Sequence, residues 1–365
     1  MKGKQVDIVL LIVTIVLLSL GVIMVLSASA PYALNMYNDS YYFFKDQFVY
    51  AVGVILMLVI SLIDYRIYKR FAKIGLIAGI ILIALVFVPG FGVTRNQATR
   101  WLDLGFFQFQ PSELTKLAVI LFFAAVLSQK KWREKLASSP IWFLIFLAIP
   151  GIISLILLKQ PHMSAAVVII VIAATIMFAA GAKIRYFLGL VPLGVGALVG
   201  MIAMAPYRLD RLKYWLDPWA DLQGEGWQLA QSLMAVGSGG LFGLGLGQSR
   251  QKYMYLPEQY NDFIFAVWCE ELGLIGGIFL IALFGIFIWR GIIVAMKCKD
   301  KFGSYMAVGI TAMIGVQAIF NIAVVTGTIP VTGMSLPFFS YGGSSLIILL
   351  CATGILLNIS RNCEK

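Results

Sequence analysis

QSRQKYMYLPEQYNDFIFAVWCEELG, residues Gln248–Gly273, carries charged side chains directly into an apolar segment. The charged residues of this stretch are Arg250, Lys252, Glu258, Asp262, Glu270 and Glu271. The run that follows Asp262 is apolar enough to enter a membrane, where an ionisable side chain is costly and indicates a functional site. We therefore expect a polar site here, and we expect the rest of the chain to hold it in a membrane.

The composition indicates a membrane protein. Of the 365 residues, 61% are hydrophobic and only 12% are charged, and the mean hydropathy is +0.92. A soluble chain of this length needs more charge to cover its surface. The net charge of +11 is typical of a protein whose cytoplasmic loops collect Lys and Arg. We therefore expect no nucleic-acid binding, since no soluble domain displays a basic patch.

Ten apolar runs approach the length of about 20 residues that a helix needs to cross a bilayer. They lie near 8–28, 47–63, 71–89, 111–128, 141–158, 161–181, 184–206, 263–289, 303–326 and 338–359. The predicted fold is therefore an all-α polytopic membrane protein with ten transmembrane helices, and residues 1–365 form a single integral membrane domain. The first run is longer than the h-region of a signal peptide, about 7–15 residues, so we expect it to be retained.

The distribution of Lys and Arg predicts the orientation of the chain. Ten spans place both termini on one side of the membrane. The terminal segments and the loops on their side hold 18 of the 28 Lys and Arg residues, whereas the longer loops of the other side hold nine. The positive-inside rule then places both termini in the cytoplasm. One long loop, about 207–262, faces outward and carries the charged stretch with it.

A second polar group surrounds the start of the run at residue 111. Its members are Arg100, Gln110, Ser112, Glu113 and Lys116. Glu113 and Lys116 are three residues apart on the expected helix, so they share a face and can pair. Lys116 then lies about 8 Å below Pro111, in the outer half of the membrane. The pair either joins two helices or lines a polar cavity, and we favour the cavity.

The acids of the charged stretch divide by their depth in the membrane. Asn261 and Asp262 are plausible caps for the helix that follows, because their side-chain oxygens can accept its free N–H groups. That interpretation does not explain Glu270 and Glu271, which lie two turns deeper. We expect those two glutamates to pair with Lys116 in a buried cluster.

Two further stretches are candidates for contact with a substrate. The glycine-rich segment GSGGLFGLGLG, within 227–247, indicates close backbone packing or a partly re-entrant loop. Arg250 and Lys252 follow it and either bind an anionic group or remain solvated. His162, the only histidine, lies at the outer start of a helix. There it is a polar rim residue or an acid–base group.

Several motifs together resemble one known family. They are RWLDLG, QPSELTK, YRLDRLKYWLDPW, GWQLAQSLMAVGSGGLFGLGLGQSRQK, LPEQYNDFIFA with EELG, and PVTGMSLPFFSYGGSSL. With the ten spans they resemble the SEDS family, which includes the division protein FtsW, the elongation protein RodA and the sporulation protein SpoVE. The resemblance covers nearly the whole chain, and the long loop is most similar to the FtsW/SpoVE branch.

This resemblance implies a peptidoglycan glycosyltransferase of the bacterial cytoplasmic membrane, acting in division or sporulation. It implies lipid II as the substrate, used outside the membrane, and a class B penicillin-binding protein as the partner transpeptidase. The family's essential aspartate in the DFIFA motif maps onto Asp262, and the other motif positions map onto Glu258, Glu113 and Lys116. The chain departs from the family where QPHMSA places His162 at a position that relatives commonly fill with Asp.

We expect Asp262 to act as the general base for the acceptor hydroxyl. The leaving group is a diphosphate, whose charge Arg100, Lys116, Arg250 or Lys252 can offset. No ligand spacing demands a metal, although a divalent cation can bind beside paired acids.

The alternatives are a lipid II flippase and a scaffold that only recruits the transpeptidase. Transporter sites tend to lie near the midplane, on broken helices in repeated halves. Here the polar residues gather in the outer third and the two halves show no repeat, which favours an enzyme.

Overall fold

Helices form in each of the ten apolar runs. The computed structural model describes residues 6–42, 48–95, 98–103, 105, 108–203, 206–224 and 226–363. The ten helices are α1 (Ile8–Tyr37), α3 (Phe48–Leu62), α4 (Tyr68–Leu85), α5 (Pro111–Leu127), α7 (Pro140–Lys159), α8 (Met163–Ala179), α9 (Ile184–Ala203), α12 (Ile264–Lys297), α13 (Lys301–Val325) and α14 (Gly343–Cys363). Hydropathy located them because a stretch that is apolar all round forms a helix buried in a bundle or in lipid.

The number of spans is not confirmed as ten. Within the described ranges, five helices are individually long and apolar enough to cross a membrane, and up to seven spans result if each of two bent helix pairs counts as one. Helix length accounts for part of this shortfall. With 15 residues in α3 and 17 in α8, these helices fall below the length of about 20 that spans a bilayer.

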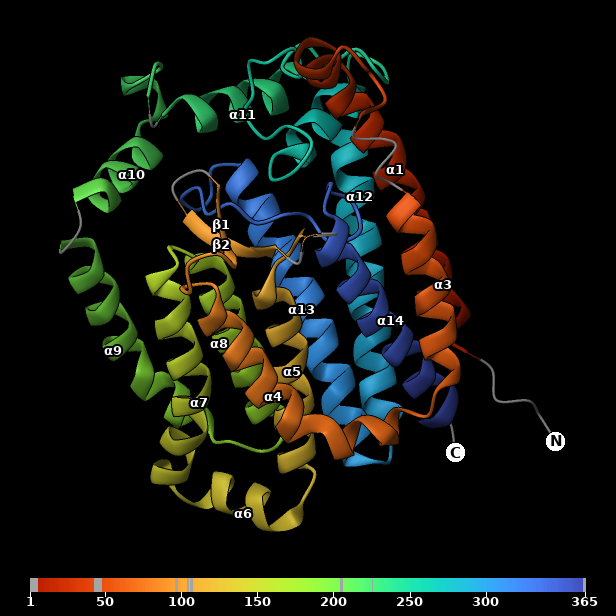
Figure 1. The fold of residues 1–365 in the computed structure, drawn as a ribbon, viewed down its shortest axis with the longest axis vertical. Helices are drawn as coiled ribbons and strands as arrows, with labels where there is room; N and C mark the ends of the chain where they lie inside the picture. The colour runs from red at the N-terminus through yellow and green to blue at the C-terminus, as the bar shows by residue number, and fades with distance from the viewer. Residues whose placement is uncertain are drawn as a thin grey trace.

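Four helix pairs build most of the bundle: α3 with α14, α4 with α5, α7 with α8, and α12 with α13. Figure 1 shows α5, α13 and α12 in its middle and α9 at its edge. The two ends of the described chain meet at one end of the bundle, where the backbone N–H of Asp7 donates to Ser360 Oγ at 3.0 Å. Arg290 Nη2 also contacts Asp7 Oδ2 at 2.5 Å. This juxtaposition agrees with an even number of membrane crossings.

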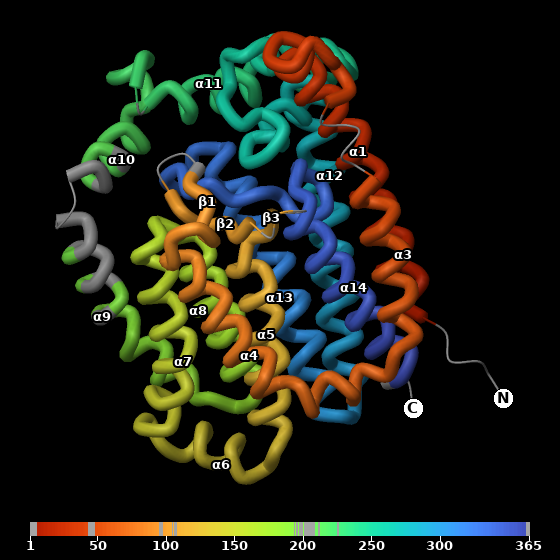
Figure 2. The backbone as a smooth tube through the Cα atoms, viewed as in Figure 1, coloured from red at the N-terminus to blue at the C-terminus, as the bar shows by residue number. Residues whose placement is uncertain are grey.

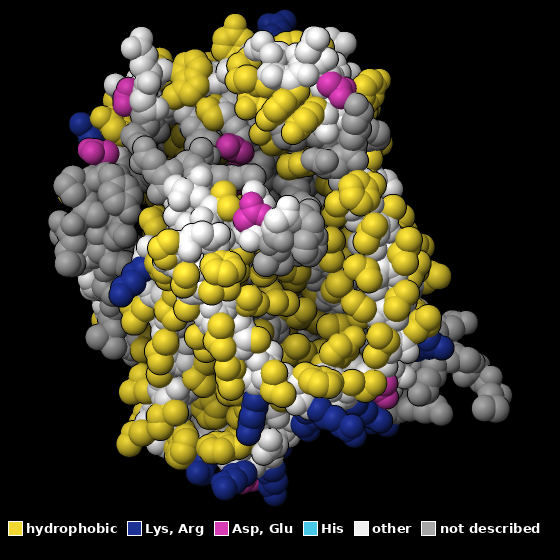
Figure 3. Space-filling model, viewed as in Figure 1, with side chains coloured by type: hydrophobic (Ala, Val, Ile, Leu, Met, Phe, Trp, Pro, Cys, Tyr) yellow, Lys and Arg dark blue, Asp and Glu magenta, His cyan; other side chains and the backbone are white. Residues whose placement is uncertain are grey.

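Charge is concentrated at the same end of the molecule. Figure 3 shows Lys and Arg side chains gathered beside the short helix α6 (Lys130–Ser138), below a broad hydrophobic surface. α6 is bent by 94° from α5. Trp132 is half-buried, and the Lys135 ammonium lies 4.2 Å from the centroid of the Trp142 ring. A belt of apolar surface with basic residues at one end is the pattern expected for a protein that crosses a membrane.

One segment outside the helices forms a small sheet. The strands β1 (Gly92–Arg95), β2 (Ala98–Asp103) and β3 (Gln108–Phe109) pair antiparallel in the order β1-β2-β3. Val93 pairs with Trp101, and Leu102 pairs with Phe109. The all-α fold is therefore correct for the membrane bundle, and this sheet is its one exception among the described residues. The sheet matters for function because it carries Arg100 and because only Gln110 separates its last strand from α5.

The long loop predicted over 207–262 contains helices of its own. These are α10 (Pro206–Leu216), the 3₁₀ turn η2 (Pro218–Ala220) and α11 (Trp227–Ser238), after which the chain turns irregularly up to α12. The 3₁₀ turns η1 (Tyr65–Ile67) and η2 each begin after an aspartate. The side chains of these residues, Asp64 and Asp217, accept hydrogen bonds from backbone N–H groups of the turns. Figure 2 shows the end of α1 beside the coils between α11 and α12.

The glycine-rich segment packs its backbone directly against a break in α12. Gly273, within α12, has φ 66° and ψ −165°. Across this break Leu244 N donates to Glu270 O at 3.0 Å, and Leu274 N donates to Gly240 O at 2.9 Å. A Cβ atom on Gly243 would lie 2.1 Å from Glu271 O. The close packing predicted for the glycines is confirmed, and it satisfies the backbone groups that the break leaves open.

Gly273→Ala is expected to destabilise the protein by about 2–4 kcal/mol. The added Cβ meets Gly243 N at 2.4 Å, and a positive φ costs an L-residue about 1–2 kcal/mol before any clash is counted. Thermal unfolding in detergent measures the effect. Gly285→Ala on the same helix is the control, because no atom lies within 4 Å of its added Cβ. Equal melting temperatures for the two variants would contradict this account of the break.

Candidate functional site

A pocket of about 750 Å³ opens among the loops at the end of the bundle opposite the chain termini. Its wall is built from β2, the start of α5, the start of α8, the loop before α12, α13 and the start of α14. Eight of the residues predicted for the site line it: Arg100, Gln110, Glu113, Lys116, His162, Glu258, Asn261 and Asp262. Segments far apart in the sequence thus converge on one polar cavity.

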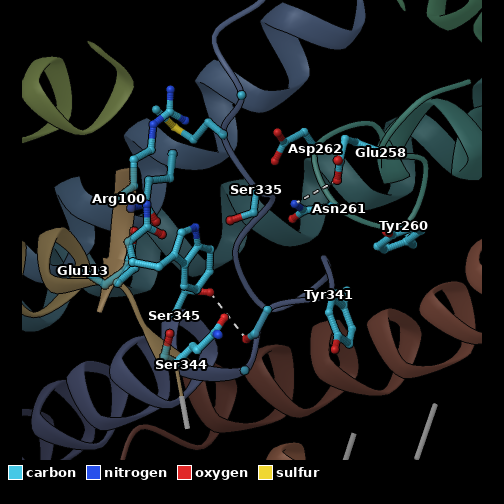
Figure 4. Close-up of a pocket in the computed structure, with 18 of the residues that line it drawn as sticks. Arg100, Glu113, Glu258, Tyr260, Asn261, Asp262, Ser335, Tyr341, Ser344 and Ser345 are labelled. Carbon is cyan, nitrogen blue, oxygen red and sulfur yellow. Dashed lines mark hydrogen bonds between the residues drawn. The ribbon is translucent and has the colours of Figure 1, made fainter. Parts of the chain in front are cut away.

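Two carboxylates form one side of the pocket, as Figure 4 shows. Asp262 is half-buried, and its Oδ2 would lie 3.3 Å from a Cβ atom on Gly333. Asn261 Nδ2 donates to Glu258 Oε2 at 3.5 Å. Glu258 has φ 52°, a left-handed conformation that is uncommon for residues other than glycine and is concentrated at functional sites. The turn after Pro257 therefore directs both carboxylates to the same cavity.

The prediction that Asn261 or Asp262 caps α12 is wrong. α12 begins at Ile264, its N-cap is Phe263, and no side chain bonds to its first N–H groups. The chain turns through Phe263, whose N–H donates to Glu258 O at 3.2 Å. The Asp262 side chain is consequently directed to the pocket and is available for chemistry.

Arg100 and the ion pair of Lys116 with Glu113 form the other side of the pocket. Lys116 Nζ lies 2.8 Å from Glu113 Oε1, and the two side chains are 3% and 12% exposed, so the predicted pairing is confirmed. Arg100 donates to the Gln160 and Pro161 carbonyl oxygens. Figure 4 places Arg100 and Glu113 across the pocket from Asp262, with Ser335 between them. A ligand in the pocket therefore meets Arg100 and the Lys116–Glu113 ion pair on one side and the Asp262 and Glu258 carboxylates on the other.

His162 lies at the base of the same wall. Its Nε2 is 3.4 Å from Gln110 Nε2, and its buried Nδ1 has no hydrogen-bond partner among the described residues. The side chain is 6% exposed. It lines the pocket as a buried side chain, and a role as an acid–base group stays a prediction. A buried nitrogen without a partner is costly unless a ligand or water satisfies it.

The predicted cluster of Glu270 and Glu271 with Lys116 does not form. Glu271 pairs instead with Lys252, whose Nζ lies 2.9 Å from Glu271 Oε1. Ser27 Oγ on α1 contacts both, at 3.0 Å from Lys252 Nζ and 2.7 Å from Glu271 Oε1. Glu270 accepts bonds from Ser249 Oγ and from the N–H groups of residues 250 and 251. The loop before α12 folds residues 249–252 back onto these acids, a contact that helix spacing cannot reveal.

Five predicted residues therefore lie outside the pocket lining: Ser112, Arg250, Lys252, Glu270 and Glu271. Ser112 is buried in the first turn of α5. Arg250 is exposed and does not line the pocket. The other three belong to the buried network just described. Through Lys252 this network ties the loop that carries Glu258 and Asp262 to Glu271 on α12 and to Ser27 on α1.

The environment of Asp262 favours its neutral form. The pKa of its carboxyl is raised to about 7, chiefly by burial and also by the nearby Glu258 charge, whereas the Arg100 charge acts to lower it. A pKa near neutrality is what a general base needs, because the group is then partly ionised and still binds a proton well. Among the described residues no group of three or more His, Cys, Asp and Glu side chains could hold a metal ion. A divalent cation beside the two acids stays a prediction.

Comparison with known proteins identifies the family. The model of the FtsW/RodA/SpoVE family, described as cell cycle proteins, matches residues 8–365. The chain belongs to this family. Stage V sporulation protein E of Bacillus subtilis is 46% identical to this family member over 99% of the chain and 98% of the relative. A protein of Geobacter sp. named probable peptidoglycan glycosyltransferase FtsW is 41% identical over 97% and 96%.

Solved structures of FtsW/RodA/SpoVE proteins share the fold. A chain of a peptidoglycan synthase complex, from a study of how polymerization and crosslinking are coordinated, superposes with a TM-score of 0.80 at 27% identity and covers 99% of both chains. The rod shape determining protein RodA of Thermus thermophilus superposes with a TM-score of 0.70 at 26% identity, over 99% of this chain and 98% of that one. These matches confirm the predicted family and the polytopic helical fold.

Sequence reasoning missed several pocket residues of this FtsW/RodA/SpoVE protein. They are Gln317 on α13 and Ser335, Tyr341, Ser344 and Ser345 around the start of α14. The segment 330–345 has no charged side chain, so no residue type in it pointed to a polar site. Gln317 is 4% exposed and lies in a helix whose other residues are largely apolar. A glutamine in such a segment is the signal that was available, since buried amides need partners.

Proposed function

We propose that this protein is a peptidoglycan glycosyltransferase that polymerises lipid II into glycan strands on the outer face of the cytoplasmic membrane. The observation that carries the proposal is the pocket with Asp262 and Glu258 facing Arg100 and Lys116. The names of the relatives support the same chemistry. Residues 1–365 act as a single integral membrane domain with both termini in the cytoplasm, in agreement with the basic surface beside α6.

In the proposed reaction Asp262 is the general base. The acceptor hydroxyl oxygen attacks the anomeric carbon of the donor sugar, and its proton passes to the Asp262 carboxylate. The bond from that carbon to the diphosphate oxygen breaks, and the lipid diphosphate leaves with the electron pair. Arg100 and the Lys116 ammonium offset the charge of the leaving group from the opposite side of the pocket. A reactive carbon held near the membrane surface suits this placement, because the lipid tail remains in the bilayer.

The partner we propose is a class B penicillin-binding protein, the transpeptidase that crosslinks the strands. The similarity to a chain of a complex that polymerises and crosslinks peptidoglycan supports this proposal. Figures 1 and 2 show the outer end of α1, α10 and α11 standing above the bundle, and these segments offer surface to an extracytoplasmic partner. The relatives leave division and sporulation both open as the process served.

Purified protein reconstituted in vesicles with lipid II tests the proposed function. We expect polymeric glycan, separated by gel electrophoresis, in the presence of the partner transpeptidase. Movement of lipid II across the bilayer is followed in the same vesicles. Transport without polymer would instead support a flippase. Neither activity in the presence of partner would support a scaffold that only recruits the transpeptidase.

Glu258→Gln is expected to shift the acidic limb of the polymerisation rate to lower pH. The Glu258 charge raises the pKa of Asp262, so its removal lowers that pKa and leaves the base ionised at a more acidic pH. A shift on the order of one pH unit is expected from the removal of a nearby like charge. Rates measured from pH 5.5 to 8.5 check it, and a shift toward higher pH would contradict the coupling of the two carboxylates.

A further inference from the structure

Three successive carbonyl oxygens hold the segment that carries Asp262. Tyr260 O accepts a hydrogen bond from the Tyr341 N–H at 3.0 Å. Asn261 O accepts one from Ser340 Oγ at 2.7 Å. Asp262 O accepts one from Asn321 Nδ2 at 2.7 Å. All three donors come from α13 and from the loop between α13 and α14, so we call this set of bonds the carbonyl clamp.

Asn321 is the most constrained member of the clamp. A side-chain amide carries two N–H donors, and both are used: the second donates to Met334 O at 2.6 Å. Asn321 is 1% exposed, and its Oδ1 is buried with no hydrogen-bond partner among the described residues. A buried acceptor without a partner costs about 1–3 kcal/mol. The two donor bonds therefore set the orientation of the side chain, although its oxygen then has no hydrogen bond among the described residues.

Ser340 links the same two loops through one hydroxyl. Its Oγ accepts from the Leu336 N–H at 2.8 Å and donates to Asn261 O, and the residue is 5% exposed. A hydroxyl offers one donor and accepts through its lone pairs, so the donor role toward Asn261 follows from the bond to Leu336. Ser340 thus closes the 336–340 turn and holds the catalytic segment at the same time.

The clamp determines where the Asp262 carboxylate points. Fixing the carbonyl oxygens on both sides of the Asp262 peptide fixes its backbone dihedral angles and hence the direction of its Cβ. Two of the three donors lie in a loop that lines the pocket through Met334, Ser335 and Tyr341. The third, Asn321 on α13, also binds this loop at Met334 O. Figure 4 shows Ser335 and Tyr341 on the pocket side of this loop, near Asp262 and Tyr260. The clamp therefore joins the segment that carries the base to the pocket-lining loop between α13 and α14.

We propose that Asn321 and Ser340 are positioning residues that hold Asp262 in its productive orientation. The proposal rests on the proposed function, because it assigns their role through Asp262. A shift of about 1 Å at a reacting group can cost about 10²-fold in rate. Loss of one bond from a clamp of three leaves the segment in place but loosens it, so each single variant is expected to lower kcat about 10-fold.

A purely structural role predicts a different outcome. A residue that only stabilises the fold lowers the amount of active protein and the melting temperature, and its effects multiply with those of other variants. Residues that act as one unit are not additive: once one bond is lost, losing the second changes little. A positioning residue also acts only through the group it positions. Its loss should have no effect when the Asp262 carboxylate is absent.

The experiment compares Asn321→Ala, Ser340→Ala and the double variant by polymerisation of lipid II in reconstituted vesicles. Rates are expressed per folded protein, with the active fraction from size exclusion and thermal unfolding. Thr311→Val on α13 is the matched control, because Thr311 is also buried with an unpartnered hydroxyl and lies outside the clamp. Ser340→Ala also keeps the test informative if Asn321→Ala fails to fold.

We expect kcat to fall about 10-fold in each single variant with KM for lipid II within about 2-fold, and the double variant to fall much less than the product. The control is expected to stay within about 2-fold of the parent. In an Asp262→Asn background, Asn321→Ala is expected to leave the residual rate unchanged. Parent-like kcat in both single variants, or a fully multiplicative double variant, overturns the inference. An inactive parent protein overturns the proposed function instead.

Discussion

Asp262→Asn is expected to reduce the rate of glycan polymerisation by about 10²–10⁴-fold and to leave the protein folded. That range is what a positioned general base contributes. The asparagine has nearly the same shape but cannot take a proton from the acceptor hydroxyl. The backbone carbonyl that Asn321 binds is unchanged, so the clamp survives the substitution. Glycan length and amount from lipid II, measured with equal quantities of folded protein, provide the test.

Asp210→Asn is the control for this prediction. Asp210 is an exposed aspartate on α10 and does not line the pocket. It undergoes the same chemical change, so its rate should match the parent. Thermal unfolding of both variants separates a loss of chemistry from a loss of structure. Polymerisation by Asp262→Asn near the parent rate would remove the assignment of the base while leaving the family membership untouched.

Lys252→Met is expected to lower the stability by about 3–5 kcal/mol, the largest structural effect we predict. The Lys252 and Glu271 side chains are 4% and 0% exposed. Removing one partner leaves a charge buried in a poor solvent without compensation, whereas replacing both by apolar residues is often nearly neutral. The double variant Lys252→Met/Glu271→Leu should therefore recover most of the loss. Denaturation in detergent, followed by circular dichroism, measures both variants.

Lys130→Met on α6 is the matched control. Lys130 and Glu134 also form a pair, at 3.7 Å, but their side chains are 81% and 64% exposed. Exposed pairs contribute about 0–1 kcal/mol, so this change should be small. If Lys252→Met proves as mild as Lys130→Met, the buried network does not hold the catalytic loop onto α12 and α1.

Much of the site followed from local features of the sequence. Glu113 and Lys116 were predicted to pair because a helix places residues three apart on one face, and the pair forms at 2.8 Å. The apolar run predicted near 111–128 forms α5, which begins at Pro111. The prediction for Lys116 with Glu270 and Glu271 failed, because depth in the membrane was the only guide to long-range partners. The loop before α12 folds back and brings Lys252, 19 residues away, to Glu271 instead.

The sequence by itself determined the membrane class, the positions of the ten helices and the candidates for the chemistry, because hydropathy and helical spacing act over a few residues. Tertiary structure alone decided which partners the two parts of the charged stretch find. Asp262 and Glu258 line a pocket with Arg100 and Lys116, whereas Glu270 and Glu271 form a buried network outside it. It also decided that Asn321 and Ser340 hold the segment of Asp262. Such contacts depend on how the whole chain packs, which no local pattern specifies.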